Sequence, residues 1–308
     1  MNLQSFLNSR QAGKLALRTS RLLPPGPGQR LASFLADRIS SNNQLPLILA
    51  LRANRWVISG GKLSASQLNE AARQNLRHIA HSYYTFFHNL SDPDALQSLV
   101  SFTPQIEELI ARSQEGKEGV IVTGLHLSNF DLVFQAAARR GLRAVGLSLP
   151  EASEAIEWQH NFRRMAGLEI LPASVENFRQ VISRLKTGHV VVTGIDRPVN
   201  GTKAHPRFFG QPAHVPVHHI HLALKAEVPI VIMGAILCPD GIYHIHSSDY
   251  IDMRRFPNRQ TEIMWNAERV LEIAADIIRQ APHQWAVMQP VWPEVLTEVP
   301  VEVENAGN

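Results

Sequence analysis

Hydrophobic positions follow a helical rhythm through the first part of the chain. In the clearest segment, 64–90, one face carries the apolar side chains Leu68, Ala72, Leu76, Ile79, Tyr83, Phe86 and Phe87. Further helices are expected before Leu22, over 29–40 and over 104–112. The first of them should end at Leu22-Leu-Pro-Pro-Gly-Pro-Gly28, because proline and glycine interrupt helices. Residues 1–115 are therefore predicted to form a helical N-terminal region that packs on the rest.

From residue 116, short apolar runs alternate with amphipathic segments. The pattern predicts strands over 120–123, 143–147, 169–171 and 189–194, with helices over 128–140, 152–166 and 174–187. A helical stretch over 217–226, strands over 228–237 and 242–248, and a long helix over 259–281 complete the pattern. Such alternation predicts an α/β fold with a mixed, mainly parallel central sheet flanked by helices. The α/β core is expected over 116–293, with an acidic tail over 294–308, in one integrated domain.

Composition narrows the class of protein. The chain has 308 residues, of which 44% are hydrophobic and 19% charged, as in globular proteins. Cys238 is its single cysteine, which excludes an intramolecular disulfide and a cysteine-based metal cluster. No run approaches the roughly 20 apolar residues of a membrane-spanning helix, and no signal peptide is recognisable.

Positive charge is concentrated near the N-terminus. Residues 1–69 hold nine basic residues and one acidic residue, Asp37, whereas the whole chain carries a net charge of only +3. Four of the basic residues fall on one helix face: Arg10, Lys14, Arg18 and Arg21. This asymmetry predicts contact with an anionic partner such as a membrane surface, although a solvated basic face fits equally well. Basic residues are not interleaved with aromatic ones, so no nucleic-acid partner is expected.

A histidine stands where the first predicted strand meets a helix. The segment Gly119–Asp131 contains a β-branched run, then His126 in the turn, then Ser128 as the expected N-cap of the next helix, with Asp131 in its first turn. A neutral imidazole can take a proton from an alcohol, and a carboxylate on its other nitrogen fixes the tautomer. The same spacing also fits a capping box, in which Asp131 serves only the helix start.

Three further blocks follow in the same order as in a known family. They are Asn161-Phe-Arg-Arg-Met-Ala-Gly167, then Asp196-Arg-Pro with Arg207-Phe-Phe-Gly-Gln-Pro-Ala213, then Ala281-Pro-His-Gln-Trp285 with Trp292. Together with His126-Leu-Ser-Asn-Phe-Asp131 they resemble the motifs of the lysophospholipid acyltransferase superfamily. The closer resemblance is to bacterial lipid A late acyltransferases and phosphatidylinositol mannoside acyltransferases. It extends over nearly the whole chain, and the four blocks in order are more specific than the His-x4-Asp motif alone.

The resemblance implies an O-acyltransferase that moves a fatty acyl group from an acyl thioester to a hydroxyl of a glycolipid or phospholipid. The donor would be acyl-CoA or acyl carrier protein, with no further cofactor and no metal. His126 would be the general base and Asp131 its orienting partner. The implied substrate-binding residues are Arg163, Arg164, Glu151, Asp196 and Arg197. Alternatively, the arginine pair belongs to the solvated surface and Glu151 serves only the first turn of a helix.

Further expectations follow from the resemblance. Backbone amides around 127–129 are candidates to stabilise an oxyanion. The protein would lie peripherally on the cytoplasmic face of the cell membrane, bound to lipids through its basic N-terminal region. The glycerol-phosphate branch carries a Phe-Pro-Glu-Gly-Thr block, which is absent here and argues against glycerol-3-phosphate or lysophosphatidate as acceptor. The hydrophobic N-terminal anchor usual in the lipid A enzymes is also missing.

Two alternatives remain open from the sequence. Where the family tends to have small residues, this chain has His214, His218, His219 and His221. These histidines make a metal-dependent hydrolase one alternative function. The other alternative is a catalytically inactive lipid-binding protein of the same fold. A serine hydrolase and a dinucleotide-binding oxidoreductase are disfavoured, because neither Gly-x-Ser-x-Gly nor Gly-x-Gly-x-x-Gly occurs.

Overall fold

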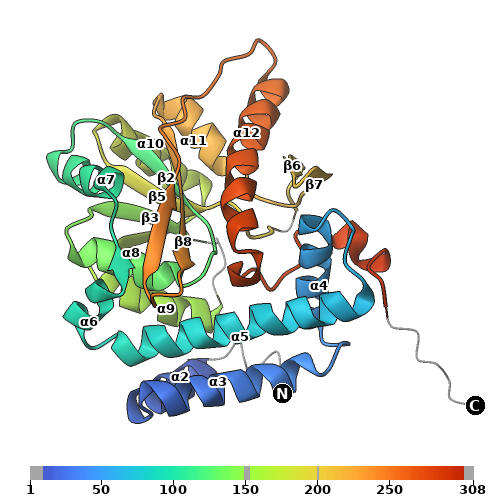
Figure 1. Ribbon diagram of the computed structural model, residues 1–308. Coiled ribbons are helices and arrows are strands. Elements are labelled where there is room, and N and C mark those ends of the chain that lie inside the picture. Colours follow the sequence, from blue (N-terminus) through green and yellow to red (C-terminus); the bar gives the residue numbers. More distant parts are fainter. Residues whose placement is uncertain (1–9, 149–152, 200, 302–308) are drawn as a thin grey trace, which may run out of the picture.

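A seven-stranded sheet forms the centre of the protein (Figure 1). The computed structural model describes residues 10–148, 153–199 and 201–301. In sheet order the strands are β1 (Val100–Ser101), β9 (Tyr243–Ser247), β8 (Ile230–Leu237), β2 (Val120–Gly124), β5 (Val190–Gly194), β3 (Ala144–Ser148) and β4 (Glu169–Pro172). β8 and β9 pair antiparallel and all other neighbours pair parallel. The predicted mixed, mainly parallel sheet is confirmed.

Both faces of the sheet are covered, which is why its central strands are continuous β-branched runs. On one face, Ile121, Val191 and Ile230 share a core with the helices α10 (Val175–Lys186), α11 (His218–Ala226) and α12 (Arg259–Gln280). On the other face, Val122 and Val190 pack against α7 (Pro104–Glu115), α8 (Phe130–Arg139) and α9 (Glu154–Met165). The strand–helix alternation predicted from residue 116 is thus present, with element ends shifted by a few residues.

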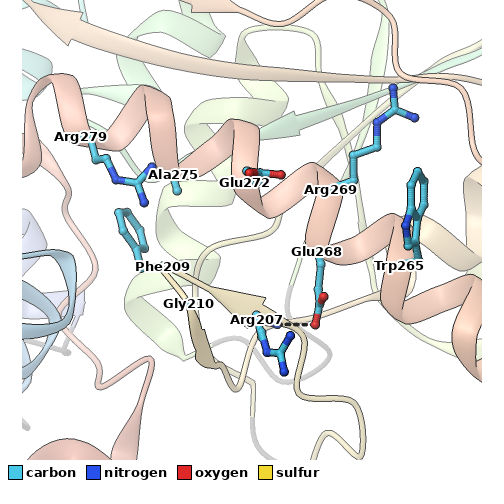
Figure 2. Close-up of a pocket in the computed structure, with 9 residues that line it drawn as sticks. All are labelled: Arg207, Phe209, Gly210, Trp265, Glu268, Arg269, Glu272, Ala275 and Arg279. Atoms are coloured by element: carbon cyan, nitrogen blue, oxygen red, sulfur yellow. Dashed lines mark hydrogen bonds between the residues drawn. The ribbon is translucent and has the colours of Figure 1, made fainter. Parts of the chain in front are cut away.

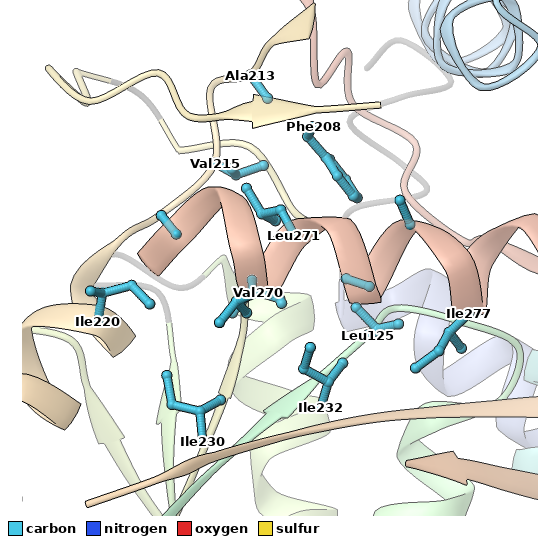
Figure 3. Packing of buried hydrophobic residues seen from close by; sticks show 14 of the residues in the cluster. Leu125, Phe208, Ala213, Val215, Ile220, Ile230, Ile232, Val270, Leu271 and Ile277 are labelled. Atoms are coloured by element: carbon cyan, nitrogen blue, oxygen red, sulfur yellow. The ribbon is translucent and has the colours of Figure 1, made fainter. Parts of the chain in front are cut away.

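Helix α12 lies between the sheet and a small hairpin. The hairpin consists of β6 (Arg207–Phe208) and β7 (Gln211–Pro212), which pair antiparallel. In Figure 3, Val270 of α12 points toward Ile230 and Ile232 on β8, whereas Leu271 lies on the side of Phe208. The hairpin is therefore anchored to the sheet through a continuous apolar core.

The N-terminal helices flank the sheet at one end. They are α2 (Arg10–Leu22), α3 (Pro25–Ser40), α4 (Pro46–Ile58), α5 (Ala65–Asn89) and α6 (Pro93–Ser98). In Figure 1, α5 runs along the end of the sheet, and α2 and α3 cover its outer side. Two short 3-10 helices, η1 (Pro282–Gln284) and η2 (Pro293–Thr297), follow α12.

Several N-terminal elements differ from the prediction. The first helix ends at Leu22 as predicted, but the second begins at Pro25 because proline is well suited to the first turn of a helix. Helices α4 and α6 and strand β1 were not predicted, so the region before residue 115 is not purely helical. β1 has only two residues, Val100 and Ser101, and pairs with β9. Such a short strand has no period for the sequence to display.

Candidate active site

His126 and Asp196 occupy equivalent positions after two neighbouring strands. β2 and β5 pair parallel with Gly124 opposite Gly194, and each site residue stands two positions beyond its glycine. The carboxyl ends of parallel strands meet at one edge of a sheet, so these side chains converge. His126 Nδ1 lies 2.7 Å from Asp196 Oδ1, and the His126 backbone N–H donates to Asp196 Oδ2 at 2.8 Å.

Asp196 is held by a third donor from a distant segment. The indole N–H of Trp285 donates to Asp196 Oδ2 at 2.7 Å, and the Asp196 side chain is fully buried. The His126 side chain is 21% exposed, and its Nε2 has no hydrogen-bond partner within the described part of the chain. With Nδ1–H donated to Asp196, Nε2 carries the free lone pair that a general base needs.

This geometry corrects the expected partner of His126. Asp131 accepts a hydrogen bond at 2.6 Å from Arg163 Nε, and the carboxylate at the imidazole is Asp196, which the sequence had suggested only for substrate binding. The physical reason is that the two aspartates face in different directions. Asp131 lies in the first turn of α8 and faces α9, whereas Asp196 emerges from the adjacent strand at the level of His126.

Ser128 is not the helix cap that the sequence predicted. The N-cap of α8 is Asn129, and Ser128 adopts φ +50°, in the left-handed region. Its hydroxyl lies 2.9 Å from His78 Nε2, and its backbone N–H donates to the Gln284 carbonyl at 2.7 Å. The capping box is therefore absent, and the Ser128 amide, one of the expected oxyanion donors, is already occupied.

Arg163 is linked to His126 through an aromatic ring. Phe130 meets the His126 imidazole edge-on, with ring centroids 4.8 Å apart, and the Arg163 guanidinium lies 5.9 Å from the Phe130 centroid. Asp131, Arg163 and Arg197 all lie within electrostatic range of Tyr83. The structure thus brings Asp131 and Arg163 to the Phe130 ring that contacts His126, and Arg197 lies within electrostatic range of Arg163 and Asp196.

Gly194 allows the imidazole to approach β5. A Cβ at this position would lie 2.9 Å from His126 Cε1, closer than real Cβ contacts. The absence of a side chain at Gly194 therefore permits the observed ring position.

Arg164, one of the predicted substrate-binding residues, has a different placement. Arg164 forms an ion pair with Glu157 at 2.6 Å, and its side chain is 42% exposed. Both residues lie on α9, so this arginine is engaged on its own helix. Glu151 lies outside the described residues.

The histidines of the 214–221 segment share no common partner among the described residues. His214 Nε2 lies 2.7 Å from Glu294 Oε1, and His218 Nε2 lies 2.8 Å from Thr193 Oγ1. His219 is fully buried, both its ring nitrogens lack a hydrogen-bond partner among the described residues, and burial holds its pKa well below the ordinary value. Within the described ranges, no three His, Cys, Asp or Glu residues are grouped to hold a metal ion.

A hollow of about 400 Å³ lies between α12 and the β6–β7 hairpin (Figure 2). Its lining consists of Arg207, Phe209, Gly210, Trp265, Glu268, Arg269, Glu272, Ala275 and Arg279. None of the predicted site residues is among them. The hollow lies near Trp285, whose indole N–H donates to Asp196. The ring centroid of Phe209, which lines the hollow, is 6.4 Å from that of Trp285.

Comparison with protein families decides the assignment. Residues 60–294 match the model of the bacterial lipid A biosynthesis acyltransferase family. The chain belongs to this family. The match spans β2, β5, η1 and the loops that carry His126, Asp196 and Trp285. A search of curated proteins finds no match.

Membership in the lipid A acyltransferase family indicates O-acyl transfer to a lipid acceptor. None of the helices in the described ranges has both the length and the apolar character to cross a bilayer.

The pairing of His126 with Asp196 escaped the sequence analysis, although a signal for it exists. The segments Val122-Thr-Gly-Leu-His126 and Val192-Thr-Gly-Ile-Asp196 share the pattern Val-Thr-Gly-x followed by a chemically active residue. Two such strands in adjacent parallel register must bring their fifth residues together. The role of Trp285 had no comparable signal, because it depends on a contact between segments 89 residues apart.

Proposed function

We propose that the protein transfers a fatty acyl group from an acyl thioester to a hydroxyl of a glycolipid or phospholipid, with His126 as general base and Asp196 as its orienting partner. The observation that carries this proposal is the buried Asp196 carboxylate at His126 Nδ1, which leaves Nε2 open. In a chain of this family, that geometry supplies a general base to remove the proton of the attacking alcohol.

The reaction proceeds without a covalent enzyme intermediate. His126 Nε2 removes the proton of the acceptor hydroxyl as its oxygen attacks the thioester carbonyl carbon, forming the new C–O bond. Collapse of the tetrahedral intermediate breaks the C–S bond, and the imidazolium returns the proton to the sulfur, so that ester and free thiol are released. Asp196 stabilises the imidazolium between these two steps.

Oxyanion stabilisation is assigned to the start of α8. Its N-cap, Asn129, makes no side-chain capping bond, so the first-turn amides are not occupied by that side chain. Helix N-termini present backbone N–H groups and a partial positive charge to an anion. Donors at Phe130 and Asp131 replace the Ser128 amide in this role, because Ser128 already donates to Gln284.

The proposed activity is tested by supplying the purified protein with either acyl-CoA or acyl carrier protein, each bearing a labelled acyl chain, together with a bacterial lipid extract. We expect the label in a lipid ester by mass spectrometry. Release of labelled free fatty acid without a labelled lipid would indicate a thioesterase and contradict the proposal. The comparison of the two donors identifies the carrier.

Arg163 and Arg164 should differ in their effect on substrate binding. We expect Arg163→Ala to raise KM for a phosphate-bearing substrate about tenfold while largely sparing kcat, because a guanidinium that binds phosphate equally in ground and transition states contributes uniform binding. Arg164→Ala is the matched control, since its partner is Glu157 on the same helix. Steady-state kinetics with donor and acceptor varied separately measure the difference.

Lysine at position 163 should restore only part of the affinity, since it lacks the planar fork of arginine. If Arg163→Ala and Arg164→Ala change KM equally, Arg163 is not part of the proposed substrate site.

The N-terminal helices support membrane binding. The outer faces of α2 and α3 expose Leu22 and Phe34, 82% and 64% accessible, and Leu35, 49% accessible. Exposed basic residues accompany them: Lys14, Arg18, Arg21, Arg30 and Arg38. Apolar side chains that insert and cations that attract anionic headgroups are the features of an interfacial helix. We propose that this face, the α2–α3 face, rests on the cytoplasmic membrane surface.

Charge reversal on the α2–α3 face should weaken vesicle binding. We expect the double variant K14E/R18E to bind vesicles containing phosphatidylglycerol at least tenfold more weakly, since each basic residue near the surface contributes about 1 kcal/mol. Co-sedimentation measures binding. The matched control is K117E/R143E, which reverses two exposed cations in loops away from α2 and α3. Equal loss in both variants, or insensitivity to salt, would contradict an electrostatic role for this face.

A further inference from the structure

Arg55 is a half-buried cation with no ion-pair partner among the described residues. It lies in the last turn of α4, and its Nε and Nη1 atoms are buried with no hydrogen-bond partner in the described part of the chain. Burial lowers the pKa of Arg55, and no carboxylate opposes that effect. Burying unpaired guanidinium N–H groups costs folding free energy. An ion that binds there would account for such groups.

One imidazole neighbours the guanidinium, and a second imidazole contacts the first. His283 on η1 is close enough that the charge of Arg55 adds to burial in lowering its pKa. His78 on α5 meets His283 edge-on, with ring centroids 6.0 Å apart. Burial, followed by the neighbouring histidines, lowers the pKa of His78 to about 3. Among the described residues, no carboxylate raises the pKa of either imidazole, so the cluster consists of donors and positive charge.

Buried asparagines hold the cluster in place. Asn75 Nδ2 on α5 donates to the carbonyls of Pro282 and Trp285 at 3.2 and 3.0 Å. Asn54, adjacent to Arg55 on α4, donates to the Val287 carbonyl at 3.1 Å. The segment that carries His283 is therefore fixed to both helices that carry the other two members of the cluster.

The cluster borders the catalytic loop and remains accessible. His78 Nε2 lies 2.9 Å from the hydroxyl of Ser128, two residues after His126. Trp285, which holds Asp196, follows His283 by two residues. His283 is exposed and Arg55 and His78 are half-buried, so part of each side chain faces solvent, although Arg55 Nε and Nη1 themselves are buried.

We propose that Arg55, His283 and His78 form a binding site for a phosphate ester beside the His126 loop. Guanidinium and imidazole N–H groups are well matched to phosphate oxygens, and one phosphate would compensate the charge of Arg55. The identity of the phosphate rests on the proposed function: it belongs either to the phosphorylated headgroup of a lipid acceptor or to the coenzyme A portion of the donor.

Inorganic phosphate tests the site independently of acyl transfer. In the full chain with ¹⁵N-labelled histidine, phosphate titration should shift the ring resonances of His78 and His283. Arg55→Gln should weaken phosphate binding by at least tenfold, because it removes the charged donor. Arg143→Gln, which changes an exposed arginine in the loop before β3, is the matched control.

A thermal melt separates ligand binding from a structural role. In phosphate-free buffer, Arg55→Gln should keep or raise Tm, because it removes an uncompensated charge. Phosphate should raise the Tm of the natural protein and of Arg143→Gln, but not of Arg55→Gln. A drop in Tm for Arg55→Gln without phosphate would mean that the guanidinium stabilises the fold itself. That result, or equal phosphate binding by the natural protein and Arg55→Gln, would overturn the proposal.

The source of the phosphate is resolved by competition. Coenzyme A and vesicles containing a phosphorylated glycolipid are added separately to the ¹⁵N-labelled protein. Shifts of His78 and His283 that depend on Arg55 with coenzyme A alone assign the site to the donor, and with the vesicles alone to the acceptor. Shifts with inorganic phosphate but with neither probe would overturn the assignment to a substrate and leave the acyl-transfer proposal standing.

Discussion

Asp196→Asn should lower kcat/KM for acyl transfer by about 10³–10⁴-fold while leaving the protein folded. Two donors, the His126 backbone N–H and the Trp285 indole N–H, converge on one oxygen of Asp196 and will select the amide oxygen of asparagine at that position. The amide NH₂ must then face Nδ1. This places the imidazole proton on Nε2 and removes the base.

Asp131→Asn is the control for this prediction. It changes the charge of a second carboxylate in the same site but one that is paired with Arg163. We expect a smaller loss of kcat/KM, caused by weakened positioning of Arg163. Steady-state kinetics of the two variants, with circular dichroism to establish folding, provide the comparison. A larger loss for Asp131→Asn would show that the working partner of His126 is Asp131.

His126→Ala should lower kcat by about 10²–10⁴-fold, the range that a general base contributes. The variant leaves the buried Asp196 without its imidazole partner, so it should also be less stable than the natural protein. Rates are therefore normalised to the folded fraction. Added imidazole should restore part of the activity by occupying the vacated space.

His189→Ala is a matched control, because His189 lies just before β5 and pairs with Thr187 rather than with Asp196. It should retain near-normal kcat. A His126→Ala variant with kcat close to that of the natural protein would exclude the proposed base.

The α/β core could be predicted because its sequence signals are local. Buried strands such as β2 and β5 consist of β-branched runs, and the helices between them have one apolar face. Helix α4 was missed because its first half, residues 46–51, is a continuous apolar run, a pattern that predicts burial without specifying a helix. The order of the strands in the sheet could not be predicted from the sequence, since it depends on contacts between strands far apart in the chain.

The site could be predicted only in part for the same reason. His126 was recognisable from its place between strand and helix, but its partner was sought nearby, at Asp131, when the register of β2 and β5 brings Asp196 into contact. The Ser128 error has a related cause. Its hydroxyl could satisfy either the helix start or His78, and the tertiary contact with α5 prevails. Local patterns therefore identified the reactive residue, and three-dimensional packing determines its partners.

The most direct test of the account is the tautomer of His126, measured by ¹⁵N NMR of the labelled imidazole at a pH where the ring is neutral. We predict that the natural protein carries its proton on Nδ1 and leaves Nε2 bare, that Asp196→Asn moves the proton to Nε2, and that Asp131→Asn changes neither nitrogen. A proton on Nε2 in the natural protein, or a tautomer that responds to Asp131→Asn and not to Asp196→Asn, would contradict the His126–Asp196 pair as the catalytic base.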